Sequence, residues 1–495
     1  MVSTVLEVES KFDARPDAIA PDLTDLPGVA SADARIDIEL SATYFDTAEL
    51  DLLRARITLR RRTGGEDAGW HLKLPWHEDR YEIREPLTGS DVVPERLRAI
   101  VLGIIRDRAL IVVATVQTHR RIVRLRDAHG DVAAEFCDDL VIAQRMRSRP
   151  FVPLRWREWE LELAEPNPAL AEAGARALTS AGATPALAPS KLARVLPSPA
   201  QATPPPTSFG PAATVAEVLE ADLRTRVETL RRLDPLVRAD LPDAVHQMRV
   251  TARRLRSVLA GYRAEFDTSV TEPLRVELGW LIERLGRARD LEVLRARVRA
   301  SAGQHHPLSA VMEASILDDR ATAHREAVAS MASPRYFALI DALDDFCDHP
   351  SFSPRAESAA EPELVACLRA QWQRLDRAVE RVEGRKGRKR ALQLHEVRRR
   401  VKRLRYATEA ARPVIGSHVD NLVGTLSEIQ DVLGHHHDAI VAVDFVQSIT
   451  DPGPEARHEN RALRRRLAQQ AAADDDWFHG LYRQLQDSPG VSWLR

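Results

Sequence analysis

The sequence contains little cysteine and no long apolar segment. The three cysteines, Cys137, Cys347 and Cys367, show no metal-ligand spacing, and their odd number gives no complete disulfide framework. A reducing cytoplasm is the simplest prediction from this usage. Charged, alternating sequence begins by Glu7, which is not the pattern of a secretory signal peptide. No apolar run is long enough for a transmembrane helix, so we expect no membrane association.

Strong net charge and aromatic side chains are also scarce. The 495 residues carry a formal net charge of −2, which argues against a generally basic nucleic-acid-binding protein. Aromatic residues make up 5%, which leaves few candidates for stacking on bases, so nucleic acid is not an expected partner. The sequence also has no glycine-rich phosphate loop and no convincing Ser/His/Asp set. An apolar content of 44% is enough for two or three ordinary cores.

A proline-rich stretch from Pro197 to Pro211 divides the chain in two. Without periodicity, it predicts a semi-rigid linker. We therefore expect an α+β multidomain protein with a β domain over residues 1–196, a linker over 197–214 and an all-α domain over 215–490. Breaks in the helical part are expected at Pro235–Pro242, Gly303–Pro307, His349–Pro354, Gly384–Gly387 and Pro452–Pro454. The expected strands are Val5–Phe12, Ile57–Arg62, Trp70–Leu74, Arg121–Leu125, Val132–Phe136 and Trp156–Leu163.

These strands share a pattern of charge on one face. Strand alternation places Glu7, Glu9 and Lys11 on one side and Leu6, Val8 and Phe12 on the other. A single charged face normally meets water. Here nearly every strand has one, with both signs present, which favours a closed antiparallel barrel or tunnel with a charged bore. The further sets are Thr58, Arg60 and Arg62; His71 and Lys73; Arg80, Glu82 and Arg84; Thr118, Arg120 and Arg124; Glu135 and Asp139; and Glu158, Glu160 and Glu162.

Such a bore suits phosphate chemistry. Arginine and lysine bind phosphate oxygens, and arginine does so with two hydrogen bonds. Clustered carboxylates hold hard divalent cations such as Mg²⁺ or Mn²⁺. Phosphoryl transfer depends mainly on positioning and charge neutralisation, so it requires no covalent nucleophile.

The C-terminal half contains an internal duplication. The segment from His246 to Arg256 aligns without gaps on the segment from His395 to Arg405. Each copy is followed by a Leu-Gly-x-x-x-Asp motif, at Leu285–Asp290 and Leu433–Asp438. Matched motifs in the same order indicate a repeated structural unit.

The repeated segments predict two basic helical stripes. At about 100° per residue the basic positions of each copy fall on one narrow face beside an apolar seam. A charge run is usually a solvated helix face. The same spacing on two helices that pack by the same seam instead favours one shared groove that binds a polyanion. Histidines on these stripes would strengthen binding as the pH falls toward about 6. The residues are His246, Arg249, Arg253 and Arg256 in the first copy, and His395, Arg398, Lys402 and Arg405 in the second.

The N-terminal part resembles the CYTH domain of the triphosphate tunnel metalloenzymes. Glu7-Val-Glu9-Ser-Lys11 is similar to the E-x-E-x-K motif that opens that domain. The order of further motifs makes the resemblance specific: Tyr44-Phe45-Asp46-Thr47, Leu59-Arg60-Arg61-Arg62, Trp70-His71-Leu72-Lys73, Glu160-Leu161-Glu162 and Ser190-Lys191-Leu192. The match covers about residues 1–196.

This resemblance implies a division of roles among the charged residues. Metal, Mg²⁺ or Mn²⁺, is expected on Glu7, Glu9, Glu160 and Glu162, with Asp139 as a further ligand. Triphosphate is expected on cationic residues, of which Lys11, Arg60, Arg62 and Lys73 are the catalytic set. The substrate-binding set is Arg84, Arg120 and Lys191.

The part from about Val215 to Leu485 resembles a CHAD domain, a conserved-histidine helical module. The duplicated helices and the two Leu-Gly-x-x-x-Asp motifs carry this resemblance. It implies two pseudo-symmetric four-helix bundles and binding of inorganic polyphosphate in a basic groove between them. The run His435-His436-His437 suggests a metal site, but we favour a substitution for Arg289 and surface positions; the same holds for His305-His306.

Together these features predict a metal-dependent hydrolase of inorganic triphosphate that also binds polyphosphate, in the cytoplasm and in contact with polyphosphate granules. One alternative is a non-catalytic polyphosphate-binding or granule-targeting protein. Another is a tunnel enzyme that cyclises ATP or hydrolyses thiamine triphosphate, because the same residues would hold any triphosphate. The sequence leaves the oligomeric state open.

Overall fold

The computed structural model describes residues 3–77, 79–146, 152–196, 208–302, 309–448 and 454–494. The chain divides into two compact units, Met1–Thr203 and Pro204–Arg495. Residues 197–207 of the predicted linker lie outside the described residues, as do the expected breaks at 303–307 and 452–453. No described helix is both long enough and apolar enough to cross a bilayer.

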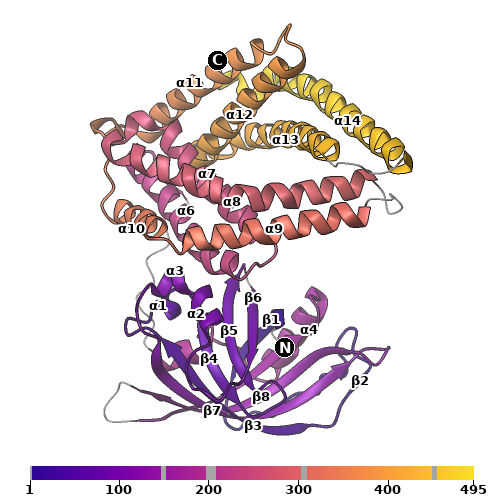
Figure 1. Cartoon of the computed structure of the whole chain (residues 1–495). Helices are drawn as coiled ribbons and strands as arrows, with labels where there is room; N and C mark the ends of the chain where they lie inside the picture. Colours follow the sequence, from indigo (N-terminus) through magenta and orange to yellow (C-terminus); the bar gives the residue numbers. More distant parts are fainter. Residues whose placement is uncertain are drawn as a thin grey trace. The chain divides into compact units, whose positions relative to one another are not determined.

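Eight long antiparallel strands of the N-terminal unit close into a barrel (Figure 1). Their order is β6, β5, β4, β3, β7, β8, β9 and β1. Strand β1 closes the ring because Ser3–Glu7 pair with β6 and Val8–Ala14 pair with β9. The predicted antiparallel barrel is thus confirmed. The strands are β1 (Ser3–Ala14), β3 (Ile36–Asp46), β4 (Thr58–Thr63), β5 (Gly69–Trp76), β6 (Asp79–Pro86), β7 (Ile111–Arg126), β8 (Val132–Arg145) and β9 (Leu154–Leu163), with the short β2 (Ser31–Ala32) and β10 (Thr184–Pro185) added to them.

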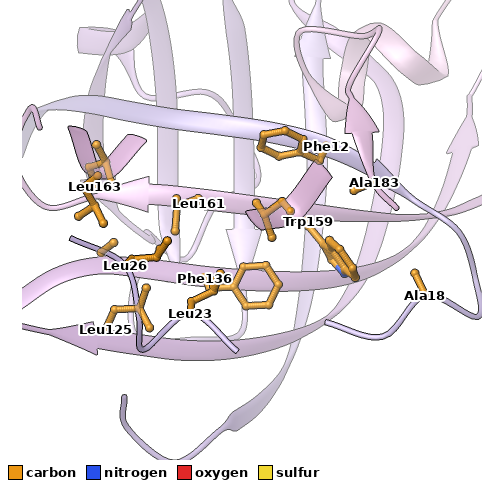
Figure 2. Packing of buried hydrophobic residues seen from close by; sticks show 13 residues of the cluster. Phe12, Ala18, Leu23, Leu26, Leu125, Phe136, Trp159, Leu161, Leu163 and Ala183 are labelled. Atoms are coloured by element: carbon orange, nitrogen blue, oxygen red, sulfur yellow. The ribbon is translucent and has the colours of Figure 1, made fainter. Parts of the chain in front are cut away.

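The apolar faces of several strands point out of the barrel, where other segments cover them. Phe12, Phe136, Trp159 and Leu161 form one cluster with side chains of helix α4 (Pro168–Ser180) and of the segment between β1 and β2 (Figure 2). Because successive residues of a strand alternate in direction, covering these side chains leaves their charged neighbours facing the bore. The hydrophobic effect therefore favours the arrangement in which the charged faces are enclosed.

Some strands extend beyond the sequence prediction. Strand β7 begins at Ile111, ten residues before the predicted start. Its first part, Ile111–Val116, is almost entirely apolar and does not alternate; it packs against the helix α5 (Lys191–Val195). Strand β3 was not predicted as a strand, although its end carries the Tyr44-Phe45-Asp46 motif. The remaining helices of this unit are α1 (Asp51–Arg54), α2 (Glu95–Ile100) and α3 (Leu102–Ile105).

The C-terminal unit is helical and consists of two similar four-helix bundles (Figure 1). In each bundle the helices pack against their neighbours in sequence, and α7 of the first bundle packs against α12 of the second. The duplicated segments lie on these two helices. The first bundle contains α6 (Val215–Arg238), α7 (Ala244–Gly261), α8 (Thr268–Ala302) and α9 (Ser309–Met331), followed by α10 (Pro334–Asp348). The second contains α11 (Ala360–Glu380), α12 (Gly387–Ile415), α13 (Asp420–Ser448) and α14 (Pro454–Asp487).

Helix boundaries follow local signals. Helix α6 begins with a capping box, in which the Thr214 hydroxyl accepts from the Glu217 backbone N–H and the Glu217 carboxylate accepts from the Thr214 backbone N–H. It continues through Pro235, where a break was predicted, and ends at Arg238. Proline lacks the N–H that would donate to the carbonyl four residues earlier, so the ladder loses one hydrogen bond, and α6 ends within one turn of it. The break before α10 was not predicted, although Ser333 caps that helix and Pro334 occupies its first position.

We predict that residues 1–196 fold without the rest of the chain. Their apolar clusters are internal: one lies under α4 and the other under α5. The fragment should be monodisperse, unfold cooperatively and retain any phosphate-releasing activity of the full-length chain. Thermal unfolding followed by circular dichroism, with the full-length chain as the control, tests this. Aggregation of the fragment, or activity that needs residues after 211, would contradict the proposed boundary.

Candidate functional sites: a charged tunnel and a basic groove

The bore of the barrel contains a cavity of about 540 Å³. Its wall carries both charge signs from β1, β4, β5, β6, β7 and β9, together with the first residue of α5. Asp139 does not line this cavity and is fully buried behind it. The residues selected from the sequence that line the cavity are Glu7, Glu9, Lys11, Arg60, Arg62, Lys73, Arg84, Arg120, Glu160, Glu162 and Lys191.

The E-x-E-x-K strand brings its charges together with β9. The Lys11 ammonium lies 3.0 Å from Glu9 Oε2 and 2.6 Å from Glu160 Oε1. Register explains the second contact, because Lys11 stands directly opposite Glu160 across the β1–β9 pair. The same pairing places Glu9 opposite Glu162. Two carboxylates thus lie side by side on one wall of the tunnel.

A second cluster forms around Glu82 of β6. Its carboxylate lies 3.8 Å from Lys73 Nζ and 3.7 Å from Arg60 Nη2, and it also pairs with Arg84. Lys73 forms a closer ion pair with Glu7, at 2.6 Å. Glu82 was not selected from the sequence, although the alternation of β6 placed it on the charged face. Its position was the signal that could have identified it. A carboxylate buried among so many cations must form ion pairs with them, because burial of an unpaired charge is costly.

A third cluster closes the far wall. Arg120 donates two hydrogen bonds to Asp139, from Nε at 2.7 Å and from Nη2 at 2.6 Å, and another to Glu160. The Lys191 ammonium lies 2.9 Å from Asp139, 2.5 Å from Glu158 and 3.0 Å from Glu160. These three carboxylates lie close enough together to hold a metal ion. Glu158, which the sequence placed on the charged face of its strand but to which it gave no site role, is part of this set, and Lys191 pairs with all three carboxylates.

Helix α5 positions Lys191. The Ser190 hydroxyl accepts a hydrogen bond from the Ala193 backbone N–H and caps the helix, so Lys191 is its first residue. Leu192 and Val195 pack against residues of β3, β7 and β8. Those residues, among them Tyr44 and Val116, lie on the bore-facing side of their strands, in line with the cavity residues Leu40 and Arg120. These apolar contacts hold α5 against the inner face of the barrel and place Lys191 among the tunnel carboxylates, which explains the Ser-Lys-Leu order of the motif.

The environment of the tunnel shifts the pKa values of its carboxyl groups in opposite directions. Burial would raise the pKa of Glu9, but Lys11 and Lys73 outweigh it and lower the pKa to about 2. For Glu7, burial outweighs Lys73 and raises the pKa to about 7. Burial also raises the pKa of Glu162, with Glu9 and Glu160 adding to the shift. Lys73 acts against this shift, but Glu162 forms no ion pair within the described residues, so a bound cation would stabilise its charged form.

The opposite wall brings three guanidinium groups together, each beside a carboxylate: Arg62 beside Asp67, Arg60 beside Glu82 and Arg120 beside Asp139. Burial, followed by Arg60 and Arg120, lowers the pKa of Arg62 to about 9. Arg60 also donates a hydrogen bond of 3.4 Å to the hydroxyl of Tyr44, a cavity residue from the Tyr-Phe-Asp-Thr motif. Three guanidinium groups that repel one another across a cavity would be stabilised by a bound anion.

In the C-terminal unit the two duplicated helices line one groove of about 750 Å³. The structure brings together all of the stripe residues from α7 and α12: His246, Arg249, Arg253, Arg256, His395, Arg398, Lys402 and Arg405. Arg249 pairs with Asp290 of the first Leu-Gly-x-x-x-Asp motif at 2.7 Å. The two repeated motifs therefore meet in space.

The glycine in each Leu-Gly-x-x-x-Asp motif has a structural role. A β-carbon on Gly286 would lie 3.6 Å from Arg249 Nη2, and one on Gly434 would lie 3.4 Å from Arg398 Nη2. Larger side chains at these positions would occupy the space of the guanidinium groups. The glycines thus allow both arginines to lie against the neighbouring helix, on the groove wall.

Groove cations are poorly compensated. Burial and the nearby Arg253, Arg398 and Arg249 lower the pKa of Lys402 to about 6, against the opposing effect of Asp438. Burial and adjacent arginines also lower the pKa of both His246 and His395. The histidines therefore protonate at lower pH than the sequence suggested, and Lys402 is a titrating group that sequence reasoning missed.

The histidine run at residues 435–437 shows no metal arrangement. The rings of His437 and His395 lie 5.7 Å apart, and His435 and His437 line the groove. Within the described residues, none of the three belongs to a group of ligands close enough to share an ion. His305-His306 lies outside the described residues.

Comparisons with known proteins match both units. Residues 6–195 match the CYTH domain family and residues 221–447 the CHAD domain family. Two uncharacterized proteins, from two strains of Mycobacterium tuberculosis, are each 35% identical over 503 residues, which cover 97% of this chain and 93% of the relative. Among solved structures, PptA from Streptomyces chartreusis is 21% identical, covering 55% of this chain and 100% of that one, with a TM-score of 0.46. The CHAD domain from the plant Ricinus communis is 23% identical, covering 57% and 95%, with a TM-score of 0.45.

Proposed function

Because this chain belongs to the proteins that join a CYTH domain to a CHAD domain, we propose that its tunnel hydrolyses inorganic triphosphate with a divalent metal and that its groove binds inorganic polyphosphate. The observation that carries the first part is the tunnel wall, where cations and carboxylates face one enclosed space. A triphosphate requires both: cations for its oxygens and carboxylates for its metal.

The cationic wall is the proposed triphosphate site. Arg60, Arg62 and Arg120 supply fixed donors that match phosphate oxygens, and Lys73 and Arg84 extend the row. In the free tunnel several of these cations are held by carboxylates, at distances such as 2.6 Å for Lys73 and Glu7. Substrate oxygens would replace those carboxylates without moving the cations far, so the site is organised before binding.

The carboxylate wall is the proposed metal site. Glu162 fits this role because it is half-buried, lines the cavity, forms no ion pair within the described residues and stands opposite Glu9 in the β1–β9 register. We assign Glu7, Glu9, Glu160 and Glu162 as the residues that would hold Mg²⁺ or Mn²⁺, and Asp139 as the residue that orients Arg120 and Lys191. The metal would supply charge neutralisation and polarise the phosphoryl group.

A phosphate-release assay tests the tunnel proposal. Purified protein is given tripolyphosphate, ATP, thiamine triphosphate or long-chain polyphosphate, each with Mg²⁺ and with Mn²⁺. We expect metal-dependent release that is fastest on tripolyphosphate. Release of pyrophosphate and a cyclic nucleotide from ATP would support the cyclase alternative, and preference for thiamine triphosphate would support the other tunnel chemistry. No turnover on any substrate would leave the non-catalytic alternative, a polyphosphate-binding or granule-targeting protein.

Excess positive charge carries the groove proposal. Cations from both copies line one concave surface, and burial, followed by the charge of neighbouring arginines, lowers the pKa of Lys402 and of both histidines. A flexible chain with a negative charge on each unit would supply counter-charge over its whole length.

We predict that polyphosphate binding takes up protons. With a pKa of about 6, Lys402 is mostly neutral in the free groove above that pH, whereas a bound polyanion favours the ammonium. Affinity should therefore rise as the pH falls from about 8 to about 6 and level off as Lys402 becomes protonated in the free protein. Calorimetry in buffers of different ionisation enthalpy measures the uptake. Lys402→Met should lower it, and an unchanged uptake in that variant would contradict the assignment.

A further inference from the structure

A small pocket adjoins the groove and is lined by residues of α7, α8 and α12. Its volume is about 240 Å³, and it shares Arg256, Ser257, Arg399 and Arg403 with the groove. We refer to it as the arginine pocket. The residues that line it are Arg256, Ser257, Ala260, Arg275, Glu396, Arg399, Arg400 and Arg403.

Positive charge exceeds negative charge in the arginine pocket. Arg275 is paired with Glu272 at 2.6 Å, and Glu396 accepts hydrogen bonds from Arg400, at 2.7 Å, and from Arg399. Within the described parts of the chain, Arg256 and Arg403 form no ion pair. Burial, followed by neighbouring arginines, lowers the pKa of both guanidinium groups. Two uncompensated guanidinium groups in one small hollow favour a bound anion.

The internal repeat supplies a comparison within the same molecule. The alignment that carries Arg249 onto Arg398 also carries Ser257 onto Tyr406 and Ala260 onto Glu409. In the same way, Arg256 corresponds to Arg405, and Arg254 corresponds to Arg403.

In the second copy of the repeat, side chains fill the space that corresponds to the arginine pocket and neutralise its positive charge. Glu409 lies 2.9 Å from Arg405 and 3.6 Å from Arg254. The Tyr406 ring lies 5.5 Å from the Arg254 guanidinium and 5.7 Å from that of Arg405. In the first copy, Ala260 and Ser257 occupy the equivalent positions. The hollow therefore stays open, and the charge of its arginines stays uncompensated. The two sides of the groove are therefore chemically different despite the repeat.

An adjoining hollow shares Ala260, Arg275 and Arg403 with the arginine pocket. It adds Arg263, Arg355 and Arg374 and the carboxylates of Glu265, Glu272 and Glu363, and these carboxylates lie in ion pairs with Arg263, Arg275 and Arg355. Among the described residues, Arg256 and Arg403 are thus the two arginines of the pocket without a carboxylate partner.

We propose that the arginine pocket binds the terminal phosphate of a polyphosphate chain whose interior lies in the groove. This inference rests on the proposed polyphosphate binding. A terminal phosphate has one more ionisable oxygen than an interior unit, so it gains more from uncompensated arginines. Because the equivalent position on the other side is closed by Glu409 and Tyr406, the groove has a single end site and holds the chain with one end fixed.

The test compares polyphosphate of one length with free ends and with ends capped as phosphoramidates. Ala260→Glu places in the pocket the carboxylate that Glu409 supplies on the other side, and Arg403→Gln removes one cation. Wild type should bind the free-ended polymer about tenfold more tightly than the capped one, the effect of a charge-assisted hydrogen bond. Both variants should lose that preference. Ala260→Glu, at a residue that does not line the groove, should leave capped-polymer affinity unchanged, whereas Arg403→Gln should also weaken capped-polymer binding, but less than binding of the free-ended polymer, because Arg403 lines the groove. Glu409→Gln is the matched control, and it should keep the preference.

Calorimetry at one salt concentration gives the affinities, and circular dichroism shows whether each variant is folded. Equal affinity of wild type for both polymers would overturn the end site. So would an equal loss for both polymers in Ala260→Glu, because the pocket would then hold interior units. A wild-type protein that binds neither polymer would instead reject the groove proposal itself.

Discussion

Glu9→Gln is expected to remove nearly all phosphate release while leaving the barrel folded. The substitution keeps the size of the side chain and removes a carboxylate whose pKa, at about 2, keeps it ionised at any working pH. Loss of charge stabilisation at a metal-dependent phosphoryl centre should lower turnover by about a hundredfold or more. Rates on tripolyphosphate with Mg²⁺ and with Mn²⁺, over a range of metal concentrations, measure the effect.

The fold should survive because the partner of Glu9 has a second partner. Lys11 lies 2.6 Å from Glu160 and keeps that ion pair in the variant. A matched control is Glu39→Gln, which removes the same charge from β3 at a side chain that is 78% exposed and does not line the cavity. It should have wild-type turnover. Undiminished turnover in Glu9→Gln, at saturating or limiting metal, would remove Glu9 from the proposed metal site.

Charge reversal on one groove helix should nearly abolish polyphosphate binding. The triple variant Arg249→Glu, Arg253→Glu and Arg256→Glu removes three cations from the α7 wall and places three carboxylates opposite the α12 wall. Attraction becomes repulsion along half of the groove. The dependence of affinity on salt should weaken too, by about one unit of log–log slope for each phosphate that the groove no longer neutralises. Titration at several salt concentrations measures both quantities.

Two controls separate a groove effect from a change of net charge. Reversing Arg231, Arg232 and Arg325, which are exposed and do not line the groove, changes the net charge equally and should preserve tight binding. Hydrolysis of tripolyphosphate by residues 1–196 should be unaffected, because that fragment lacks the groove. If the α7 triple variant and the surface control bind equally well, the stripes are ordinary solvated helix faces and the groove proposal fails.

Alternation and repetition in the sequence were sufficient to predict the architecture. Charged residues of both signs at every second position on nearly every strand predict a barrel whose bore encloses them. The apolar residues between them, such as Phe12, Phe136 and Trp159, then lie outside the barrel and are covered there by other segments. Alternation at every second residue identifies the face of the strand on which a side chain lies, but not the residue with which that side chain pairs. That Lys11 meets Glu160, or that Lys73 meets Glu7, depends on the register of strands far apart in sequence. For that reason Glu82 and Glu158 were overlooked, and Asp139 was expected among the lining residues when it lies behind them.

A charged β barrel, a helical repeat and two sets of residues suited to phosphate and metal follow from the amino-acid order alone, because periodicity and spacing are local properties. Which charges neutralise one another is a property of the folded chain, since ion pairing depends on distances between elements that barrel closure and helix packing bring together. The groove illustrates the division. The aligned copies already differ in sequence at Ser257 and Tyr406 and at Ala260 and Glu409. Only the packing of the helices shows that Glu409 and Tyr406 contact Arg254 and Arg405, whereas the first copy keeps a pocket with unneutralised arginines.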